Sequence, residues 1–517
     1  MTLFTLKEYL AFLTKNGVEF ECVDCNGANT DVTEYSDRVV GLVSCDSKKI
    51  EKDTLFICKG AHFKEEYLKS AVENGAFIYI AQHEYAGVNV PCIRTNEVRL
   101  AMSLLASFYY NDPWRTLDVV GITGTKGKSS TAYYVKAILD KYEEKNKLPE
   151  SGVVSSIDTY DGVERFESHL TTPEPLDLER HFAHAVQTGI KHLTMEVSSQ
   201  ALKYDRVRGV NFRVAAFLNI GYDHISPIEH PDWRDYFDSK LMIFDECQTA
   251  VVNLDSDNAD EILGKAKSSK TAKEIITFSE KNTDADVYGY DVNGRDGGID
   301  FKVKTADFDE QFRIEMSGLF NVSNALAAIA ITGALGVDVK SMQDGLLDAR
   351  VPGRMEVFRS KDKKITAIVD YAHNRLSFQK LFESVQEEYP GSRVVIVFGC
   401  PGKKALDRRH DLGDIAATYA AHCYLTEEDP GEDDAYEICE EIALAVKARN
   451  CEYSIDIDRG TSIESAIEDA KKFEEPTIIL ITGKGRETRE KRGIEYIPVP
   501  SDVDYVLEHI GKYDCQE

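Results

Sequence analysis

The chain has 517 residues, of which 43% are hydrophobic and 29% charged, so it is long enough for about three domains with sizeable cores. Its formal net charge of −28 argues against a nucleic-acid partner, because phosphate backbones are bound by an excess of Lys and Arg. No stretch approaches the ~20 consecutive apolar residues of a membrane span, and the 11 cysteines, without a secretion signal, indicate reduced thiols. We therefore expect a cytoplasmic protein.

The first domain is predicted to span residues 1–112. The spacing of Leu6 and Leu10 predicts an amphipathic helix near the start, and residues 76–80 read as a buried strand. Asn, Asp and Pro at 111–113 form a turn signal, directly before the next predicted strand.

The next segment is a phosphate-binding loop. The apolar run 117–122 predicts a strand, and Val135 and Ile138 follow at helical spacing after a glycine-rich turn. Glycines let backbone N–H groups converge on an anion, and the helix N-terminus adds positive potential. The common nucleotide-binding pattern has glycine five residues before Gly127, where this chain has Ile122, so the loop fits a shorter variant, G-T-x-G-K-S. The predicted phosphate-binding residues are Gly124, Thr125, Lys126, Gly127, Lys128, Ser129 and Ser130.

Polar residues follow two more strands of the same predicted sheet. Glu196 ends the strand 192–197, and Asp223 and His224 come after the strand 214–220. Open α/β sheets bind ligands at the carboxyl ends of their strands, so these side chains are candidates for a Mg²⁺ site facing the phosphates. The alternatives are a capping or surface role for Glu196 and a structural Asp–His pair.

The remaining elements complete an α/β fold. A strand-rich segment at 286–316 and a helix at 321–335 end a central domain, 113–350. The third domain, 351–517, carries near-continuous apolar strands, which are typical of a parallel sheet covered on both faces. We predict three domains, with a central phosphate-loop NTPase-like parallel sheet and a C-terminal Rossmann-like α/β domain.

A series of motifs occurs in order along the chain: GTKGKSS, TTPEP, MEVSSQAL, FLNIGYDH, DYFDSK, GLFNVSNALAA, PGRME, VDYAHN and TGKGRE. Together they resemble the Mur ligase family, the ATP-dependent amide-forming enzymes of peptidoglycan precursor synthesis. TTPEP, MEVSSQAL and the N-terminal CDSKKIEKDTLFICKG resemble its MurE branch, which adds the third stem-peptide residue to UDP-MurNAc-L-Ala-D-Glu. The match covers nearly the whole chain.

The resemblance implies a reaction and its participants. ATP would phosphorylate the D-Glu side-chain carboxylate, and the amine of a diamino acid would attack the resulting acyl phosphate. The implied ligands are ATP, two Mg²⁺ ions, UDP-MurNAc-L-Ala-D-Glu and the amino acid, in a protein that we expect to be a monomer. The N-terminal domain would bind UDP-MurNAc, the central domain ATP, and the C-terminal domain the amino acid while closing over ATP.

The resemblance also implies roles for single residues. Lys128 would bind phosphates, Ser129 and Glu196 would serve one Mg²⁺, and His224 a second. Lys240 matches a lysine that becomes carbamylated, and the anionic carbamate would orient the metals. Carbamylation needs a neutral amine, hence a lowered pKa. From the residues alone, Lys240 reads instead as an exposed helix lysine.

Further residues match the family's ligand-binding positions. Asn321 and Asn324, one helical turn apart, resemble an adenine-contacting pair, the alternative being a helix cap and a surface Asn. Arg354 and Asp370 resemble groups that reach the ATP phosphate and ribose. The expected substrate-binding residues are Ser47 near the uridine, Thr171, Thr172, Ser198 and Arg206 around the UDP-MurNAc-dipeptide, His373 beside Asp370, and Asp429 and Glu487 at the amino acid.

One departure bears on the amino acid. Family members that add meso-diaminopimelate carry D-N-P-R where this chain has Glu428-Asp429-Pro430-Gly431, and their arginine forks onto the distal carboxylate. Gly431 cannot do this, whereas Glu428 and Asp429 suit a distal ammonium. This favours L-lysine, with ornithine or meso-diaminopimelate as alternatives.

Two rival functions are a folylpolyglutamate synthetase-like ligase and a non-catalytic Mur-like partner protein. The MurE-type motifs argue against the first. Intact Lys128, Glu196, His224 and Lys240 argue against the second, because a scaffold has no chemical need for all four.

Overall fold

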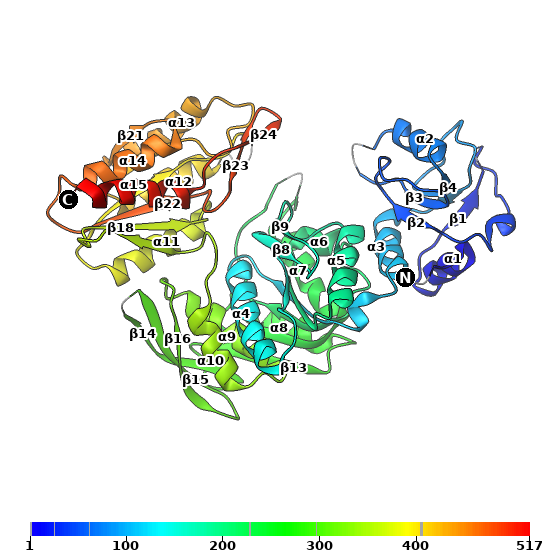
Figure 1. Cartoon of the computed structure of the whole chain (residues 1–517), viewed down its shortest axis with the longest axis horizontal. Helices are drawn as coiled ribbons and strands as arrows, with labels where there is room; N and C mark the ends of the chain where they lie inside the picture. The colour runs from blue at the N-terminus through cyan, green and yellow to red at the C-terminus, as the bar shows by residue number, and fades with distance from the viewer. Residues whose placement is uncertain are drawn as a thin grey trace. The chain divides into compact units, whose positions relative to one another are not determined.

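The computed structural model describes residues 3–24, 26–60, 63–226, 229–295, 297–403 and 407–516. It divides into two compact units, which we describe one at a time (Figure 1). The first comprises Met1–Tyr288 with Ala327–Gly345, and the second Gly289–Leu326 with Leu346–Glu517.

The first unit begins with a five-stranded sheet between helices. Its order is β1 (Glu21–Val23), β5 (Cys92–Arg94), β4 (Ala76–Ala81), β3 (Thr54–Ile57) and β2 (Leu42–Ser44), parallel except for β1. Helices α1 (Leu6–Lys15) and α3 (Val98–Tyr109) cover one face, and α2 (Glu65–Glu73) the other. Because side chains alternate along a strand, Ile78 and Ile80 join the core under α1 and α3, whereas Tyr79 joins the core under α2.

A larger sheet holds the phosphate loop. Its order in the first unit is β13-β12-β11-β6-β10-β7-β8-β9, and the first residues of β14 (Val287–Arg295) pair with β13. The strands are β6 (Asp118–Thr123), β7 (Gly152–Val154), β8 (Asp158–Tyr160), β9 (Arg165–Glu167), β10 (His192–Glu196), β11 (Phe212–Phe217), β12 (Cys247–Asn253) and β13 (Glu274–Ser279). Strands β13 to β7 are parallel, while β8 and β9 form an antiparallel edge.

Helices pack on both faces of this sheet. The helical segments that follow the five-stranded part are α4 (Lys128–Asn146), α5 (Pro175–Thr188), α6 (Ser199–Lys203), α7 (Trp233–Leu241), α8 (Ala259–Ser268) and α10 (Val339–Asp348), with short turns η2 (Pro113–Arg115) and η3 (Met242–Glu246); the turn η1 (Thr33–Tyr35) belongs to the five-stranded part. Met195 and Phe217 of the sheet pack against Phe182 of α5 and Phe237 of α7 in one buried core. This packing fixes the strand ends that carry the candidate site.

The second unit starts with β14 (Val287–Arg295), β15 (Gly298–Lys304) and β16 (Asp309–Ile314), followed by α9 (Asn321–Ala334), which continues into the first unit. Its main sheet has the order β17-β18-β22-β19-β20-β21, and all of its pairings are parallel except that of β17. These strands are β17 (Glu356–Arg359), β18 (Ile365–Asp370), β19 (Arg393–Phe398), β20 (His422–Leu425), β21 (Glu452–Ile455) and β22 (Thr477–Thr482). A separate hairpin is formed by β23 (Arg489–Arg492) and β24 (Glu495–Pro498).

Two layers of helices sandwich this sheet (Figure 1). Helices α14 (Arg459–Ala470) and α15 (Asp502–Gln516) share one core with β18, β19 and β22. Helices α11 (Arg375–Glu388), α12 (Asp407–Tyr419) and α13 (Ala435–Ala448) lie on the other face, as right-handed crossovers require. The predicted fold class, α/β with parallel sheets and a Rossmann-like C-terminal part, is confirmed.

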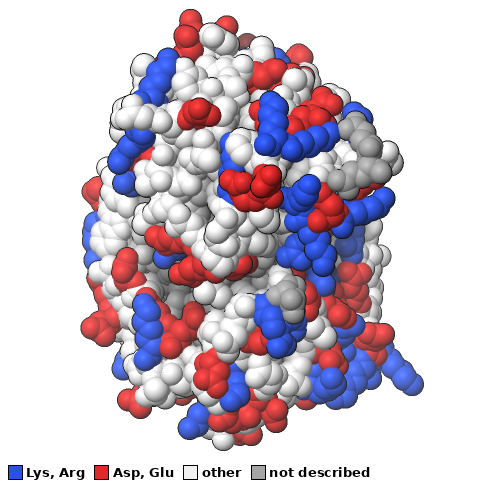
Figure 2. Space-filling model, turned by 90° about the vertical axis from the view of Figure 1, so that its left-hand side faces the viewer, with Lys and Arg blue, Asp and Glu red and all other residues white. Residues whose placement is uncertain are grey.

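The surface drawn in Figure 2 carries both signs of charge, with Lys and Arg lying among Asp and Glu. Among the described residues, no helix combines the length and the apolar character needed to cross a membrane.

Candidate active site

The phosphate loop follows β6 and leads into α4. Gly124 (φ +154°) and Gly127 (φ +83°) adopt backbone conformations that favour glycine. A Cβ on Gly124 would also lie 3.0 Å from the Cβ of Leu218 and 3.3 Å from the backbone nitrogen of Asn219. The strand predicted at 214–220 is β11, which begins two residues earlier, at Phe212, and ends at Phe217, so that Asn219 lies in the segment after the strand.

Asn219 holds this loop by hydrogen bonds. Its side-chain oxygen accepts from the Lys126 N–H at 2.9 Å, and its Nδ2 donates to the Lys126 carbonyl at 3.0 Å. The Thr125 N–H donates to the Asn219 carbonyl at 3.0 Å. The loop is therefore held from a neighbouring strand end, with the α4 N-terminus behind it, an arrangement suited to an anion.

Two lysines meet at the same carbonyl oxygen. Lys128 Nζ and Lys240 Nζ each donate to the Gly124 carbonyl at 2.9 Å. Lys240 is only 2% exposed, so its interpretation as an exposed helix lysine is wrong: α7 turns this side chain into the core. Burial, followed by the positive charge of Lys128, holds the pKa of Lys240 well below its usual range.

Glu196 lies at the end of β10, beside the phosphate-loop strand, and is 1% exposed, so the surface alternative is wrong. Its Oε1 accepts from the Ser156 N–H at 2.8 Å and from the Ser156 hydroxyl at 3.1 Å. The Ser156 hydroxyl also lies 3.1 Å from that of Ser129. Ser156 thus links two predicted Mg²⁺ ligands. Ser156 was not among the predicted site residues, although its position just after the apolar strand β7 could have indicated it.

His224 lies on the other side of the loop and is more open. Its side chain is 45% exposed, and its backbone has a positive φ of 57°. Its Nδ1 lies 3.3 Å from Glu229 Oε1, and the neighbouring Asp223 pairs with Lys126 at 3.2 Å. The ring of Tyr236 lies 5.9 Å from the His224 ring and 4.7 Å from Lys240 Nζ, so these predicted metal-site residues flank one aromatic side chain.

Three predicted substrate-binding residues gather behind Glu196. The Thr172 hydroxyl donates to the Glu196 carbonyl at 2.9 Å and accepts from the Ser198 N–H at 3.1 Å. Arg206 donates to the Thr172 carbonyl at 3.2 Å. Thr171 is half-buried next to this group. Ser47 lies in the turn after β2, and no described contact joins it to the other predicted residues.

A cavity of about 950 Å³ lies in the first unit, lined by residues from the ends of β3 and β4, the start of α3 and the segment after α6. Its cationic lining residues are Lys59, Arg99, Lys203 and Arg208. Four acidic residues, Glu97, Asp205, Asp245 and Glu246, line the same cavity, so its formal charges balance. The described lining includes none of the predicted substrate-binding residues.

In the second unit, Asn321 and Asn324 form a buried pair, 1% and 6% exposed. Asn324 Nδ2 donates to Asn321 Oδ1 at 3.0 Å, and Asn321 Nδ2 donates to the Ser317 carbonyl at 2.7 Å. The alternative of a surface Asn at position 324 is therefore wrong.

Arg354, Asp370 and His373 gather around Tyr371. The Arg354 guanidinium lies 4.5 Å from the Tyr371 ring centroid, and the His373 Nδ1 lies 2.8 Å from the Tyr371 carbonyl. Asp370 accepts from the Met355 N–H at 2.9 Å. The Tyr371 hydroxyl donates to Glu487 at 2.6 Å, so this residue connects the group with the predicted amino-acid site.

Lys484 joins the two carboxylates predicted to bind the amino acid. Its Nζ lies 2.9 Å from Asp429 Oδ1 and 2.9 Å from Glu487 Oε2. The adjacent Glu428 is buried, which raises its pKa to about 8, although Arg459 and Lys484 act in the opposite direction. Lys484 and Tyr371 were not predicted as site residues, although both lie within motifs that carry the resemblance to the Mur ligases.

The chain is similar to proteins of known activity. Residues 122–332 match the family described as Mur ligase middle domain, and residues 353–485 match the Mur ligase, glutamate ligase domain. A UDP-N-acetylmuramyl-tripeptide synthetase from Lactobacillus acidophilus is 34% identical over 495 residues, covering 92% of this chain and 93% of that protein. A UDP-N-acetylmuramoyl-L-alanyl-D-glutamate--L-lysine ligase from Enterococcus faecalis is 36% identical over 474 residues, covering 91% of each.

The fold is similar to solved structures as well. That of a UDP-N-acetylmuramoyl-L-alanyl-D-glutamate--2,6-diaminopimelate ligase matches with a TM-score of 0.66 at 22% identity, covering 95% of this chain and 98% of that one. Two family domains match in sequence order, and relatives above 30% identity span about nine-tenths of the chain. The chain belongs to the Mur ligase family.

Proposed function

We propose that this chain catalyses the ATP-dependent joining of a diamino acid, L-lysine, to the D-Glu side-chain carboxylate of UDP-MurNAc-L-Ala-D-Glu. The observation that carries the proposal is the convergence of Lys128 and Lys240 on the Gly124 carbonyl, inside a glycine loop at a helix N-terminus. The relative from Enterococcus faecalis, named as an L-lysine ligase, supports the choice of substrates.

The residues around the loop fit the ligands of a phosphoryl transfer. Lys128 would hold phosphate oxygens, and the loop N–H groups would bind the remaining charge. The hydroxyl of Ser129 and the carboxylate of Glu196 are oxygen donors of the kind that Mg²⁺ prefers, and Ser156 holds both. Bound Mg²⁺ would neutralise charge on the transferred phosphoryl group.

Lys240 fits the proposed carbamylation. Its burial and the neighbouring Lys128 favour the neutral amine, which is the form that adds to CO₂ with release of a proton. The carbamate would place a negative charge where the ammonium is disfavoured. We expect Lys240→Ala to lose ligation and to recover part of it with added short carboxylates, whereas exposed Lys145→Ala keeps full activity.

The amino-acid site supports a cationic side chain. Asp429 and Glu487 share the single ammonium of Lys484, which leaves net negative charge between them. Gly431 has a positive φ of 61° and is held by backbone hydrogen bonds to Lys491 and Gly493, so no guanidinium projects from this position. A second ammonium group suits this site better than a second carboxylate.

We assign one ligand to each predicted domain. Residues 1–112 would bind the UDP-MurNAc part, 113–350 ATP, and 351–517 the amino acid. We also propose a monomer, which light scattering on the purified protein tests.

The decisive experiment measures phosphate release by the purified protein with ATP, Mg²⁺ and UDP-MurNAc-L-Ala-D-Glu, offering lysine, ornithine and meso-diaminopimelate in parallel. We expect the highest kcat/KM with lysine. Preference for meso-diaminopimelate would overturn the argument from Gly431. Release with none of the three amines, in a folded protein that binds ATP, would support the non-catalytic partner instead.

A further inference from the structure

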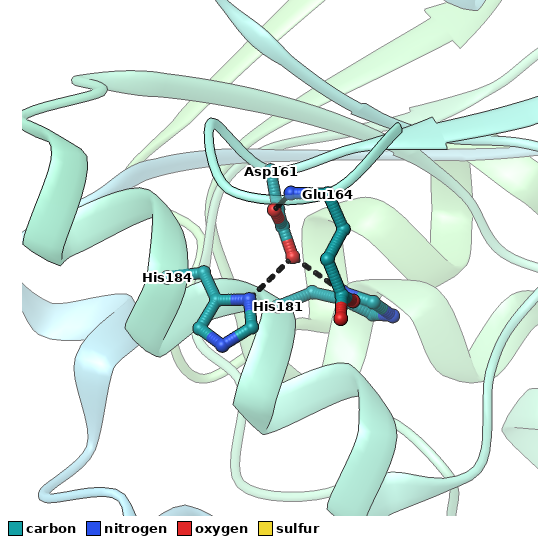
Figure 3. A group of neighbouring side chains, drawn as sticks. All are labelled: Asp161, Glu164, His181 and His184. Atoms are coloured by element: carbon teal, nitrogen blue, oxygen red, sulfur yellow. Dashed lines mark hydrogen bonds and ion pairs between the residues drawn. The ribbon is translucent and has the colours of Figure 1, made fainter. Parts of the chain in front are cut away.

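A cluster of four ionisable side chains lies apart from the phosphate loop, where the β8–β9 hairpin meets α5. Asp161 and Glu164 come from the hairpin turn, and His181 and His184 from successive turns of the helix (Figure 3). One ligand atom from each of the four lies within 4.8 Å of all the others. Nothing in the proposed ligase reaction uses these residues.

The two imidazoles converge on one carboxylate oxygen. Asp161 Oδ2 lies 2.6 Å from His181 Nδ1 and 2.9 Å from His184 Nδ1 (Figure 3). Asp161 is fully buried and His181 is 2% exposed. Glu164 Oε2 lies 3.9 Å from His181 Nδ1, with a half-exposed side chain that also pairs with Arg180 at 2.6 Å.

The Asp161 carboxylate is oriented by the backbone. Its other oxygen, Oδ1, accepts from the Val163 N–H at 2.9 Å and the Glu164 N–H at 2.7 Å. Gly162 lets the turn approach α5, because a Cβ there would lie 2.2 Å from the Thr188 hydroxyl. Hydrogen bonds that orient a carboxylate through its second oxygen are the usual support of a metal-ligating group.

We propose that Asp161, His181, His184 and Glu164 bind one divalent transition-metal ion of the zinc type. Two imidazoles and one or two carboxylates are a borderline donor set, which favours Zn²⁺ or Co²⁺ over the all-oxygen preference of Mg²⁺. Bonds of about 2.0–2.2 Å in tetrahedral geometry separate neighbouring ligand atoms by about 3.4 Å. The two Nδ1···Oδ2 contacts would therefore lengthen by less than about 1 Å to admit the ion.

Glu164 and solvent complete the coordination. The partly exposed sides of His184 and Glu164 give the ion a path from solvent, and Glu164 can exchange Arg180 for the metal. The ion would tie the β8–β9 hairpin to α5, whose first turn follows the segment that carries Thr171 and Thr172. We expect a structural ion, which does not depend on the ligase reaction.

The test is titration of the metal-stripped, full-length protein with Zn²⁺ by calorimetry and with Co²⁺ by visible absorption, both in excess Mg²⁺. We expect one equivalent to bind, and at least about tenfold weaker binding in His184→Ala and Asp161→Asn. His410→Ala, at an exposed histidine outside the cluster, and Cys451→Ser, which removes a thiol 3.9 Å from Cys423, serve as controls that keep the wild-type affinity.

Thermal unfolding provides a second readout. At the same Zn²⁺ concentration, the midpoint should rise by more in the wild type and both controls than in His184→Ala. Less than one equivalent bound to the wild type would overturn the proposal, and so would equal affinities in His184→Ala and His410→Ala. If His184→Ala does not fold, His184→Gln replaces it, and the wild-type stoichiometry decides independently.

Discussion

Glu428 offers a direct test of the electrostatics in the second unit. It is 8% exposed, and burial raises its pKa to about 8, against the attraction of Arg459 and Lys484. The site is also crowded, because a Cβ on Gly483 would lie 2.1 Å from Glu428 Oε2. The protein therefore holds this carboxyl in its neutral form near pH 7.

The substitution Glu428→Gln keeps the shape and removes the titration. A carboxyl whose pKa is raised on folding stabilises the protein fully below the unfolded value of 4.5, and this contribution is lost as the pH rises through about 8. At about 1.4 kcal/mol for each pKa unit, the wild type should lose on the order of 4–5 kcal/mol relative to Glu428→Gln between pH 4.5 and pH 9.

The assay follows urea and thermal unfolding of both proteins at several pH values across this window, with Glu440→Gln, an exposed acid on α13, as the control. Circular dichroism measures the unfolding of the whole chain, and hydrogen exchange in β20 and β22 measures the stability of the unit that holds Glu428. Parallel stability curves for the wild type and Glu428→Gln would refute the assignment of a neutral buried carboxyl.

Three further predictions test packing, metal positioning and a buried ion pair. Gly345→Ala should destabilise the first unit by about 1–3 kcal/mol, because its Cβ would lie 2.4 Å from a backbone atom of α4, whereas Gly264→Ala, facing open space on α8, should not lower the thermal midpoint. Ser156→Ala should raise the Mg²⁺ concentration for half-maximal activity by about tenfold while kcat at saturating Mg²⁺ stays near the wild-type value; an unchanged Mg²⁺ dependence would contradict the positioning role. Arg459→Ala leaves the buried Asp502 without its cation and should lower the free energy of unfolding, measured in urea, by about 3–5 kcal/mol. Arg486→Ala, which removes the half-exposed partner of Glu356, should lower it by less than about 1 kcal/mol.

The sequence predicted the parallel strands well, because their apolar runs are bounded by glycine and polar residues. The strand predicted at 76–80 is β4, which ends one residue later, and the phosphate loop follows β6 as expected. Local pattern is enough for such elements, since burial on both faces selects apolar residues at every position.

The environment of single polar side chains could not be predicted in the same way. Lys240 lies on a helix of mixed composition, and only the packing of α7 against the phosphate loop shows that its amine is buried. Lys484 bridges Asp429, which is 55 residues away in the chain, so its partner follows from the fold and not from spacing. The roles assigned to the site residues, and the domain boundaries, stay predictions.

The shared Gly124 carbonyl has a consequence for the order of events. The charge of Lys128 is one reason why the Lys240 amine prefers to be neutral. Phosphate groups bound at the loop would cancel that charge and make protonation of Lys240 easier, which removes the form that reacts with CO₂. For the proposed carbamylation, we therefore expect the nucleotide-free protein to accept CO₂ better than the ATP-bound protein, so that preincubation with bicarbonate before ATP shortens any lag in turnover.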